Sequence, residues 1–430
     1  MSAPLAVISV MLALTLAGGV WVGFALLATG WISLELFVNM RVERFLAGDL
    51  WGTATAIELV TLPLFILMGE ILFHTRLSEN LFAGLAPFVR RLPGRLMHVN
   101  VLGCTLFAAV SGSSAATTAT VGRITLKELE ARGYDKVFAA GALAGSGTMG
   151  FLIPPSIPLI VYGVLAEVSI LDLFVAGIGP GLILAVLFMG WIGTVALISP
   201  RSVPPAEPRT SWGQKGRALL KLLPVTALIG FVVGSMYAGF ASVTEAAAVG
   251  VLGAAILALL EGQLTFRMMK GALLGAVRTC SMIGLIIAGA LFLSKAMARL
   301  GIPTEVAQGI EAMGLSPVAL ILLLMLFYLL LGCFIDGLST IVMTLPVTLP
   351  LVVAAGFDPV WFGIFLIVTI EMAQITPPIG FNLFVIKGLT GLPIGALARS
   401  AAPFCGILVL LVLLLLAFPG IALWLPETMR

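Results

Sequence analysis

Two short stretches decide how this chain folds: Gly150-Phe-Leu-Ile-Pro-Pro-Ser156 and Gln374-Ile-Thr-Pro-Pro-Ile-Gly380. Each places a Pro-Pro pair inside an otherwise apolar segment. Proline removes a backbone donor and clashes with the preceding helical turn, so each pair predicts a helix that breaks and restarts. Within lipid such a break persists only where protein or a polar cavity satisfies the freed backbone groups. The sequence therefore predicts two broken helices whose irregular segments lie inside the protein.

The surroundings of the two pairs match, which indicates an internal duplication. Pro154 and Pro377 lie 223 residues apart, and the same offset aligns Asp135 with Asp358. Matched broken helices in two halves of a membrane protein are typical of transporters that bind solute and ions near the bilayer midplane.

Composition places the chain among α-helical membrane proteins. Hydrophobic residues make up 60% of it and charged residues 10%, whereas a soluble domain carries about 25% charge. Apolar segments long enough to span a bilayer recur along the whole sequence, while a transmembrane β-barrel would show short alternating segments. The net charge of +3 is too small to suggest a nucleic-acid partner. The four cysteines are scattered and show no metal-binding or disulfide spacing.

The apolar segments predict most of the transmembrane helices. Residues 3–38 should form two helices that turn near Gly18-Gly19, because one straight helix would run roughly 50 Å against a ~30 Å hydrocarbon core. An amphipathic connector around Arg41 and Arg44 follows. Further spans are expected at about 51–73, 136–163, 172–198, 219–238, 243–260, 271–298, 358–386 and 400–425.

Two more apolar stretches, 98–122 and 317–355, are interrupted at mid-length by small polar residues. The interruptions, Ser111-Gly-Ser-Ser114 and Asp336-Gly-Leu-Ser-Thr340, each predict a re-entrant hairpin with its tip inside the membrane. Basic residues flank the first hairpin on both sides, whereas no Lys or Arg flanks the second closely. Because cytoplasmic loops are rich in Lys and Arg, the first hairpin should open to the cytoplasm and the second to the outside.

The expected architecture is an all-α polytopic membrane protein with two inverted repeats. It contains about ten transmembrane helices, two re-entrant hairpins and two broken helices. Both termini should lie outside the cytoplasm. The predicted units are a first repeat at 1–198 with hairpin 98–122 and broken helix 136–163, a basic cytoplasmic linker at 199–221, and a second repeat at 222–430 with hairpin 317–355 and broken helix 358–386.

The first hairpin tip and the first break combine hydroxyl groups with unwound backbone. Small residues also serve helix packing, and packing is the interpretation that we favour for Thr117, Thr118 and Thr120. For Ser111–Ser114 and for 147–155 we favour function. Hydroxyl and carbonyl oxygens suit a dehydrated Na⁺, and N–H groups at half-helix ends can hold an anion.

The second hairpin tip and break repeat the pattern with two acids added. Asp336 and Glu371 would be costly facing lipid, so both should face protein or water. For Glu371 a structural and a functional role are equally expected, while Thr376, Gln374 and Asn382 are candidates for binding solute or cation. Proton coupling through Asp336 ranks below sodium coupling, because the breaks already supply neutral oxygen ligands.

Single acids also occur in other apolar helices. Structural pairing is the expected role for Glu35, Glu58, Glu70 and Glu245, and among them Glu245 is the strongest candidate for a functional role.

Signatures of enzymes are weak. The two histidines lie far from the breaks, and neither an HExxH zinc motif nor a P-loop occurs. An intramembrane hydrolase using Ser113 or Asp336 is a remote alternative, because a serine nucleophile needs an adjacent base and Asp336 has no obvious acidic partner.

These motifs resemble the large membrane subunit of the tripartite ATP-independent periplasmic (TRAP) transporters, the DctM-like family. The resemblance covers essentially the whole chain and implies a sodium-driven permease, not an enzyme, in the bacterial inner membrane. It implies uptake of an organic carboxylate delivered by a periplasmic binding protein, a small four-helix membrane subunit as partner, and an elevator motion. The segments that carry the resemblance are Phe65–Glu70, Ser111–Ser114, Gly147–Ser156, Thr244–Gly250 and Ile375–Phe384.

The resemblance also implies site residues. Sodium ions are the expected cofactor, and no organic cofactor is expected. One sodium site would use Ser111, Ser114, Gly150, Ile153 and Pro155, and the other would use Gly332, Ala373, Thr376 and Ile379, mostly through backbone carbonyls. We predict solute contacts at Ser113, Thr148, Asp336, Ser339, Gln374 and Asn382. Where the family often reads Gly-Leu-Ile-Thr-Pro-Pro, this chain has Ala373 and Gln374, and Ala adopts fewer backbone conformations than Gly. This departure could alter the second sodium site or mark a solute preference.

One alternative within transport is a self-sufficient divalent-anion/sodium symporter, which would need no binding protein. A purely structural scaffold gives no reason to duplicate costly helix breaks. The sequence leaves open the solute, the number of coupled ions, the oligomeric state and whether the small subunit is a separate chain.

Overall fold

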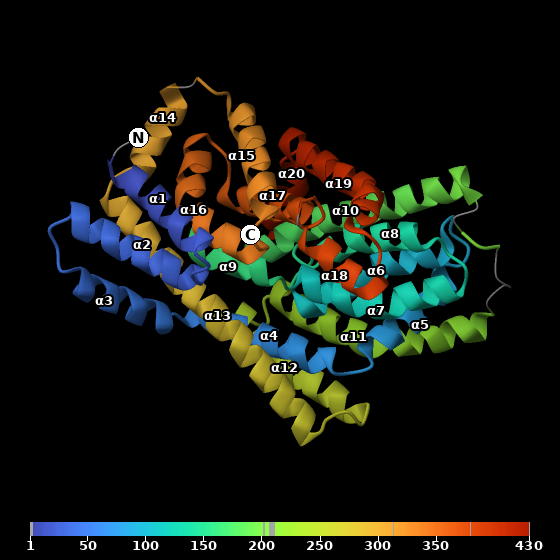
Figure 1. Cartoon of the computed structure of the whole chain (residues 1–430). Coiled ribbons are helices and arrows are strands. Elements are labelled where there is room, and N and C mark those ends of the chain that lie inside the picture. The colour runs from blue at the N-terminus through green and yellow to red at the C-terminus, as the bar shows by residue number, and fades with distance from the viewer. Residues whose placement is uncertain (1–2, 201–202, 206–210, 313, 379, 430) are drawn as a thin grey trace.

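The computed structural model describes the chain except for residues 1–2, 201–202, 206–210, 313, 379 and 430 (Figure 1). All regular elements of the described residues are helices, so the prediction of an all-α protein is confirmed. In the first half these are α1 (Ala3–Ala17), α2 (Val22–Phe37), α3 (Val42–Ala54), η1 (Ile57–Val60), α4 (Thr61–Phe73), α5 (Leu77–Val89), η2 (Arg95–Met97), α6 (His98–Ser111), α7 (Ser114–Ala131), α8 (Lys136–Thr148), α9 (Ile157–Ala166) and α10 (Ile170–Ile198).

The described residues of the second half form ten further helices. They are α11 (Trp212–Tyr237), α12 (Val243–Leu260), α13 (Phe266–Arg299), α14 (Ile302–Ala312), α15 (Pro317–Gly332), α16 (Gly337–Ala354), α17 (Pro359–Gln374), α18 (Phe381–Thr390), α19 (Ile394–Ala417) and α20 (Gly420–Met429). The helix ends at 111–114 and 332–337 coincide with the predicted hairpin tips. The gaps at 148–157 and 374–381 coincide with the predicted breaks.

Length and composition identify which described helices could each cross a membrane alone. Six of them pass this test: α10, α11, α12, α13, α16 and α19. Helix α3 and the η1–α4 segment form a bent pair, with an angle of 53° between them, that could count as a seventh. The chain is thus a multi-pass membrane protein by composition. The expected ten spans also require the shorter apolar helices, so that number stays a prediction.

Five segments differ in detail from the sequence-based expectation. The span expected at 51–73 is interrupted after Ala54, where Gly and Thr residues form helix poorly. The span expected at 400–425 ends at Ala417, because Pro419 disfavours helix in the residue before it. Helix α11 begins inside the predicted linker, where Ser211 and Gln214 form a capping box. Helices α5 and α14 were not expected, since neither contains a long apolar run.

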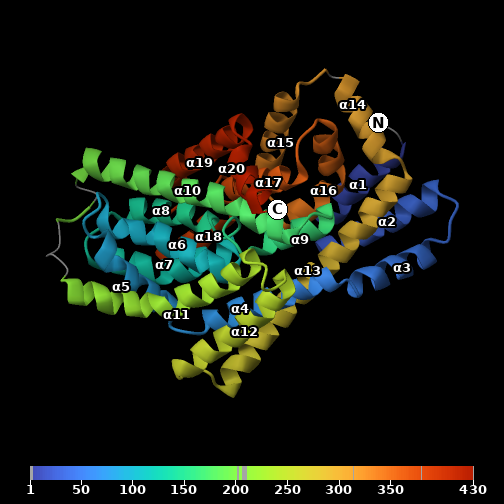
Figure 2. The same cartoon turned by 180° about the vertical axis from the view of Figure 1, so that it is seen from behind.

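Two sets of helices pack closely together and can be found by their labels in Figures 1 and 2. In the first group, α13 lies along α2 and α4, and α4 lies along α12. The members of this group are coloured blue and yellow. In the second group, α8 packs against α7 and α19, and α18 packs against α7, so teal and red helices lie together. Helix α17 is buried on all sides from Val360 to Gln374. A helix that is apolar all round belongs at the centre of a structure, and α17 places the second break there.

Candidate functional site

The first hairpin tip rests directly on the first break. Helix α6 ends at Ser111, the chain reverses at Gly112 with φ 55°, and α7 starts at Ser114. The backbone N–H of Ile157 donates to the carbonyl of Gly112 at 3.4 Å. A Cβ on Gly112 would lie only 3.1 Å from the carbonyl oxygen of Pro155, so glycine permits both the turn and the close approach.

The first break presents backbone oxygens to this tip. A Cβ on Gly150 would lie 2.7 Å from the backbone of Ser113 and Ser114, so the two segments touch through main chain. Within the described residues, the carbonyls of Gly150, Ile153 and Pro155 accept no hydrogen bond. Three of the predicted sodium ligands therefore have free acceptor oxygens.

The two predicted serine ligands lie at the same tip but already make hydrogen bonds. The Ser111 hydroxyl lies 2.7 Å from the hydroxyl of Thr117. The Ser114 hydroxyl donates to the carbonyl of Gly147 at 3.1 Å and accepts from the Asn382 amide at 2.7 Å. The Ser111 hydroxyl also accepts from the backbone N–H of Ser113 at 3.3 Å. A hydroxyl has two lone pairs, and Ser114 accepts one hydrogen bond, so Ser114 keeps acceptor capacity for a cation.

The second hairpin tip has a carboxylate as its helix cap. The Asp336 side chain accepts from the backbone N–H of Ser339 at 3.1 Å and begins α16. The Thr340 hydroxyl donates to the Asp336 carbonyl at 2.9 Å. Asp336 is exposed while Ser339 is buried. Asp336 is therefore a helix cap whose free carboxylate edge faces away from the packed core.

This second tip lies on the second break, as the first tip lies on the first. A Cβ on Gly332 would be 2.6 Å from the Cβ of Ala373. The Cys333 thiol donates to the carbonyls of Thr376 at 3.7 Å and Pro377 at 3.4 Å. The Thr376 hydroxyl donates to the carbonyl of Met372 at 2.7 Å. Gly332, Ala373 and Thr376 are thus brought together, while the fourth predicted ligand, Ile379, lies outside the described residues.

Contacts between the two halves of the chain join the two tip-and-break pairs into one centre. A Cβ on Gly337, at the second tip, would lie 2.7 Å from the Phe151 ring of the first break and 3.4 Å from the Gln374 amide nitrogen. In the other direction, the Asn382 amide of α18 reaches Ser114 of the first tip. The side-chain amide oxygen of Asn382, Oδ1, is buried and has no hydrogen-bond partner among the described residues.

The predicted solute-binding residues occupy different environments within this centre. Ser113 caps α7, accepting from the backbone N–H of Ala116 at 3.4 Å, and is partly exposed. Gln374 and Asn382 are buried. Thr148 is also buried, and its hydroxyl donates to the carbonyl of Gly145 at 2.7 Å within its own helix. The six assignments stay predictions. Thr148 is the residue whose hydroxyl is already bonded within its own helix.

Glu371 lies between the two breaks, one turn before the end of α17. It is fully buried and lies near the backbone N–H groups of Phe151 and Leu152. Neither carboxylate oxygen reaches hydrogen-bond geometry with a described residue. Both roles considered for Glu371 remain open at this position.

Glu245 has a structural role that accounts for its position. Its carboxylate accepts from the backbone N–H and from the hydroxyl of Ser242, both at 2.8 Å, which completes a capping box at the start of α12. The Ser-x-x-Glu spacing is a sequence signature of this motif. That signal was available in the sequence and points to capping rather than to binding.

Sequence reasoning also missed an ion pair outside the centre. The Lys295 ammonium on α13 donates to the carboxylate of Asp49 on α3, whose side chain is buried. This ion pair links α3 to α13, and no local sequence motif predicts it.

The chemistry of the centre suits a hard cation. No group of three or more His, Cys, Asp or Glu side chains that could hold a metal occurs among the described residues. The available donors are hydroxyl and carbonyl oxygens, which suit alkali cations rather than transition metals.

Four helices begin at the same centre. They are α7, α9, α16 and α18, and their first residues follow Ser113, Ser156, Asp336 and Gly380. Backbone N–H groups and the helix dipole make such N-termini favourable to anions. The arrangement can therefore accommodate an anion next to a cation.

Comparisons with known proteins identify related sequences. The family model described as "Tripartite ATP-independent periplasmic transporter, DctM component" matches residues 9–421. The C4-dicarboxylate TRAP transporter large permease protein DctM of Pseudomonas aeruginosa is 34% identical over 404 residues, which are 93% of each chain. The sialic acid TRAP transporter large permease protein SiaM of Vibrio cholerae is 31% identical over 96% of each chain.

A solved structure shares the fold. The YdaH transporter of Alcanivorax borkumensis superposes with a TM-score of 0.64, covering 94% of this chain and 98% of its own, at 16% identity. At that identity the likeness concerns the fold alone. The family match and these relatives show that this chain belongs to the DctM family, as the large permease subunit of a tripartite ATP-independent periplasmic transporter, and is not an enzyme.

Proposed function

We propose that this permease imports an organic carboxylate together with sodium ions by an elevator motion across the bacterial inner membrane. The observation that carries the proposal is the joined centre, in which each hairpin tip lies on its own break and the two repeats meet at Asn382 and Ser114. Unwound backbone is placed there twice, as secondary transporters with inverted repeats require.

Sodium would be held by the two sets of oxygens described above. The free carbonyls of Gly150, Ile153 and Pro155 with the Ser111 and Ser114 hydroxyls would form the first set. Gly332, Ala373 and Thr376 would supply the second, with Ile379 as the fourth predicted member. Because most ligands are carbonyls, the sites depend on backbone geometry more than on side-chain identity.

The solute would bind where the four helix N-termini meet. Ser113, Ser339, Gln374 and Asn382 surround this point on the two tips and the second break. A bound sodium ion beside a carboxylate offsets part of its charge, so binding of the ion and binding of the solute would favour each other. The named solutes of the relatives, C4-dicarboxylates and sialic acid, are both carboxylates, which supports this class.

The partners would be a periplasmic binding protein that delivers the solute and a small membrane subunit. Support comes from the family, whose printed description is that of a tripartite transporter. The exposed apolar side chains on α11, α12 and α13 would contact lipid and this subunit.

An elevator motion would slide the second helix group past the first. At their boundary, a Cβ on Gly69 of α4 would lie 2.9 Å from the carbonyl of Val110 beside the first tip. Because Gly69 has no side chain, α4 presents no atom there that would obstruct movement of the first hairpin tip along it. The inverted topology expected from the charge distribution would let both hairpins serve as gates.

Uptake into proteoliposomes, with the binding protein and small subunit supplied, tests the coupling ion. Solute accumulation should collapse when the Na⁺ gradient is removed at constant membrane potential. Uptake indifferent to Na⁺ would reject sodium coupling, and uptake by this chain without a binding protein would favour a self-sufficient symporter.

Three threonine and serine variants test the site assignment in the same assay. Ser111→Ala and Thr376→Ala should raise the Na⁺ concentration for half-maximal uptake roughly 5-fold or more, about the loss of one ligand hydrogen-bonding group. Thr120→Ala, on the same helix as the first tip, is the matched control and should leave it unchanged. Equal effects of all three variants would refute the assignment.

A further inference from the structure

A cavity of about 670 Å³ lies between α5 and α7, away from the joined centre. Its α5 wall is mainly apolar and its α7 wall is mainly basic, so the cavity has two chemically different sides. The α5 wall contains Phe82, Ala83, Ala86 and Pro87, and the basic side contains Arg90, Arg123, Lys127 and Arg132.

The side chains that line this cavity include more cations than acids. Its two acids are Glu79 and Glu128, against four cations. The Glu128 carboxylate is already bonded to Arg132 at 3.2 Å. Arg123 and Lys127 are exposed, stand one turn apart on α7 and make no ion pair with any described residue. Like charges at this spacing repel each other, so a bound anion would relieve the repulsion.

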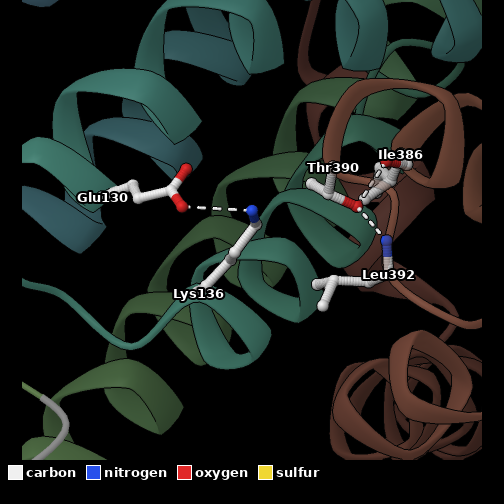
Figure 3. Close-up of polar contacts among 5 residues, drawn as sticks. All are labelled: Glu130, Lys136, Ile386, Thr390 and Leu392. Atoms are coloured by element: carbon white, nitrogen blue, oxygen red, sulfur yellow. Dashed lines mark hydrogen bonds and ion pairs between the residues drawn. The ribbon is translucent and has the colours of Figure 1, made fainter.

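A second cavity, of about 330 Å³, lies on the other side of the same two cations, between α7, α8 and the end of α18. Figure 3 shows three of its lining residues: the Lys136 ammonium reaches the Glu130 carboxylate at 3.1 Å, and Thr390 of α18 lies on the other side of the view. Glu130, the acid that lines this second cavity, is therefore already paired with Lys136. It leaves the positive charge of Arg123 and Lys127 uncompensated from this side too.

The surroundings of the larger cavity are those of a membrane surface. Phe88 and Leu92, just beyond its apolar wall, are 43% and 40% exposed. This point rests on the proposed inverted topology, in which the basic ends of α5 and α7 face the cytoplasm. Basic pockets between membrane helices on that side suit the headgroups of anionic lipids.

We propose that the cavity between α5 and α7 binds an anionic phospholipid. Its phosphate lies between Arg123 and Lys127, and the start of an acyl chain lies along Phe82 and Ala83. The apolar wall distinguishes this ligand from a small soluble anion, which would gain nothing from it. Bound in this way, the lipid bridges α5 to the second limb of the first hairpin.

Lipid titration of the purified transporter complex in detergent tests the proposal. Phosphatidylglycerol should bind more tightly than phosphatidylcholine, as read by native mass spectrometry and by the shift in melting temperature. Arg123→Gln with Lys127→Gln should weaken phosphatidylglycerol binding roughly 30-fold, since each cation near a membrane surface contributes about a factor of five. Arg267→Gln with Lys270→Gln is the matched control, because this exposed pair at the start of α13 lines neither cavity and should leave binding unchanged.

A second variant tests the apolar wall without altering charge. Ala83→Leu partly fills the cavity and should weaken phosphatidylglycerol binding while glycerol phosphate, the headgroup without chains, shows little binding to either protein. Equal lipid binding by wild type and the α7 double variant, or full binding of glycerol phosphate alone, overturns the proposal. Lipid binding needs no Na⁺ or solute, so its failure is separable from failure of sodium-coupled uptake.

Discussion

Gly150 shows at the scale of one residue how a missing side chain shapes the centre. Its α-carbon faces the backbone of Ser113 and Ser114, and the atoms that a Cβ would meet at 2.7 Å are main-chain atoms. Main-chain atoms, unlike a side chain, cannot change rotamer to make room for an added Cβ. The first break and first tip are therefore held at a separation that only glycine allows.

We predict that Gly150→Ala lowers solute uptake roughly 10-fold or more, although the carbonyl of residue 150 is retained. Overpacking costs about 1–3 kcal/mol, which must appear as a shift of the tip away from the break. Uptake and the Na⁺ concentration for half-maximal uptake measure the effect.

Gly190→Ala is the control for this substitution. Nothing lies within 4 Å of a Cβ at Gly190 in α10, and alanine in a helix interior is favoured over glycine by about 1 kcal/mol. The control should keep full uptake. Normal uptake by Gly150→Ala would show that the tip and the break are free to separate.

At the scale of an element, the start of α12 separates a capping role from a functional one. Ser242 and Glu245 satisfy each other and the first turn of the helix. We predict that Ser242→Ala destabilises the protein by about 1 kcal/mol, the usual contribution of an N-cap. The melting temperature of the purified complex should fall by a few degrees.

Glu245→Gln is the informative companion. Glutamine completes a capping box as glutamate does, so this variant should melt near the wild-type temperature and keep sodium-dependent uptake. A loss of uptake with unchanged melting would instead give the charge of Glu245 a direct role.

Elements differed in how readily the sequence revealed them. The breaks at 149–156 and 375–380 coincide with the prediction because proline acts locally and irrespective of the fold. Helices α5 and α14 were missed because short amphipathic helices carry polar residues on one face and break the apolar pattern. The interruption after Ala54 follows from weak helix formers, which lower the stability of a helix without fixing its end.

The candidate site was predictable in its positions but not in its contacts. Polar residues at matched tips and breaks could be named from the sequence, since both repeats carry them. The bond from Asn382 to Ser114 joins residues 268 positions apart, and no local pattern encodes it. The same holds for the Asp49–Lys295 pair, which depends on how α3 lies against α13.

At the scale of the whole molecule, the two helix groups predict which parts move together. Thr61 on α4 and Thr244 on α12 lie in the first group, with hydroxyl oxygens 2.6 Å apart. Gly69 and Ser111 face each other across the boundary, where a Cβ on Gly69 would lie 3.7 Å from the Ser111 α-carbon. Both pairs are within reach of a disulfide.

We predict opposite outcomes for these two cross-links in a background lacking the four native cysteines. Oxidised Thr61→Cys with Thr244→Cys should retain uptake, because both helices belong to one rigid group. Oxidised Gly69→Cys with Ser111→Cys should lose the uptake measured for its own reduced form and regain it with a reductant. Unchanged uptake after oxidation of the second pair would contradict an elevator motion at this boundary.

The amide of Asn382 has a consequence for how the two halves depend on each other. Its fully buried partner, Ser114, lies in the other half of the chain, so the Asn382 amide depends on the first half for its hydrogen bond. If the chain descends from a duplicated gene, we expect the single-copy ancestor to have obtained such a contact from a second molecule. Fusion then made the partnership permanent, and from that point substitutions on one side of the contact were constrained by the residue on the other.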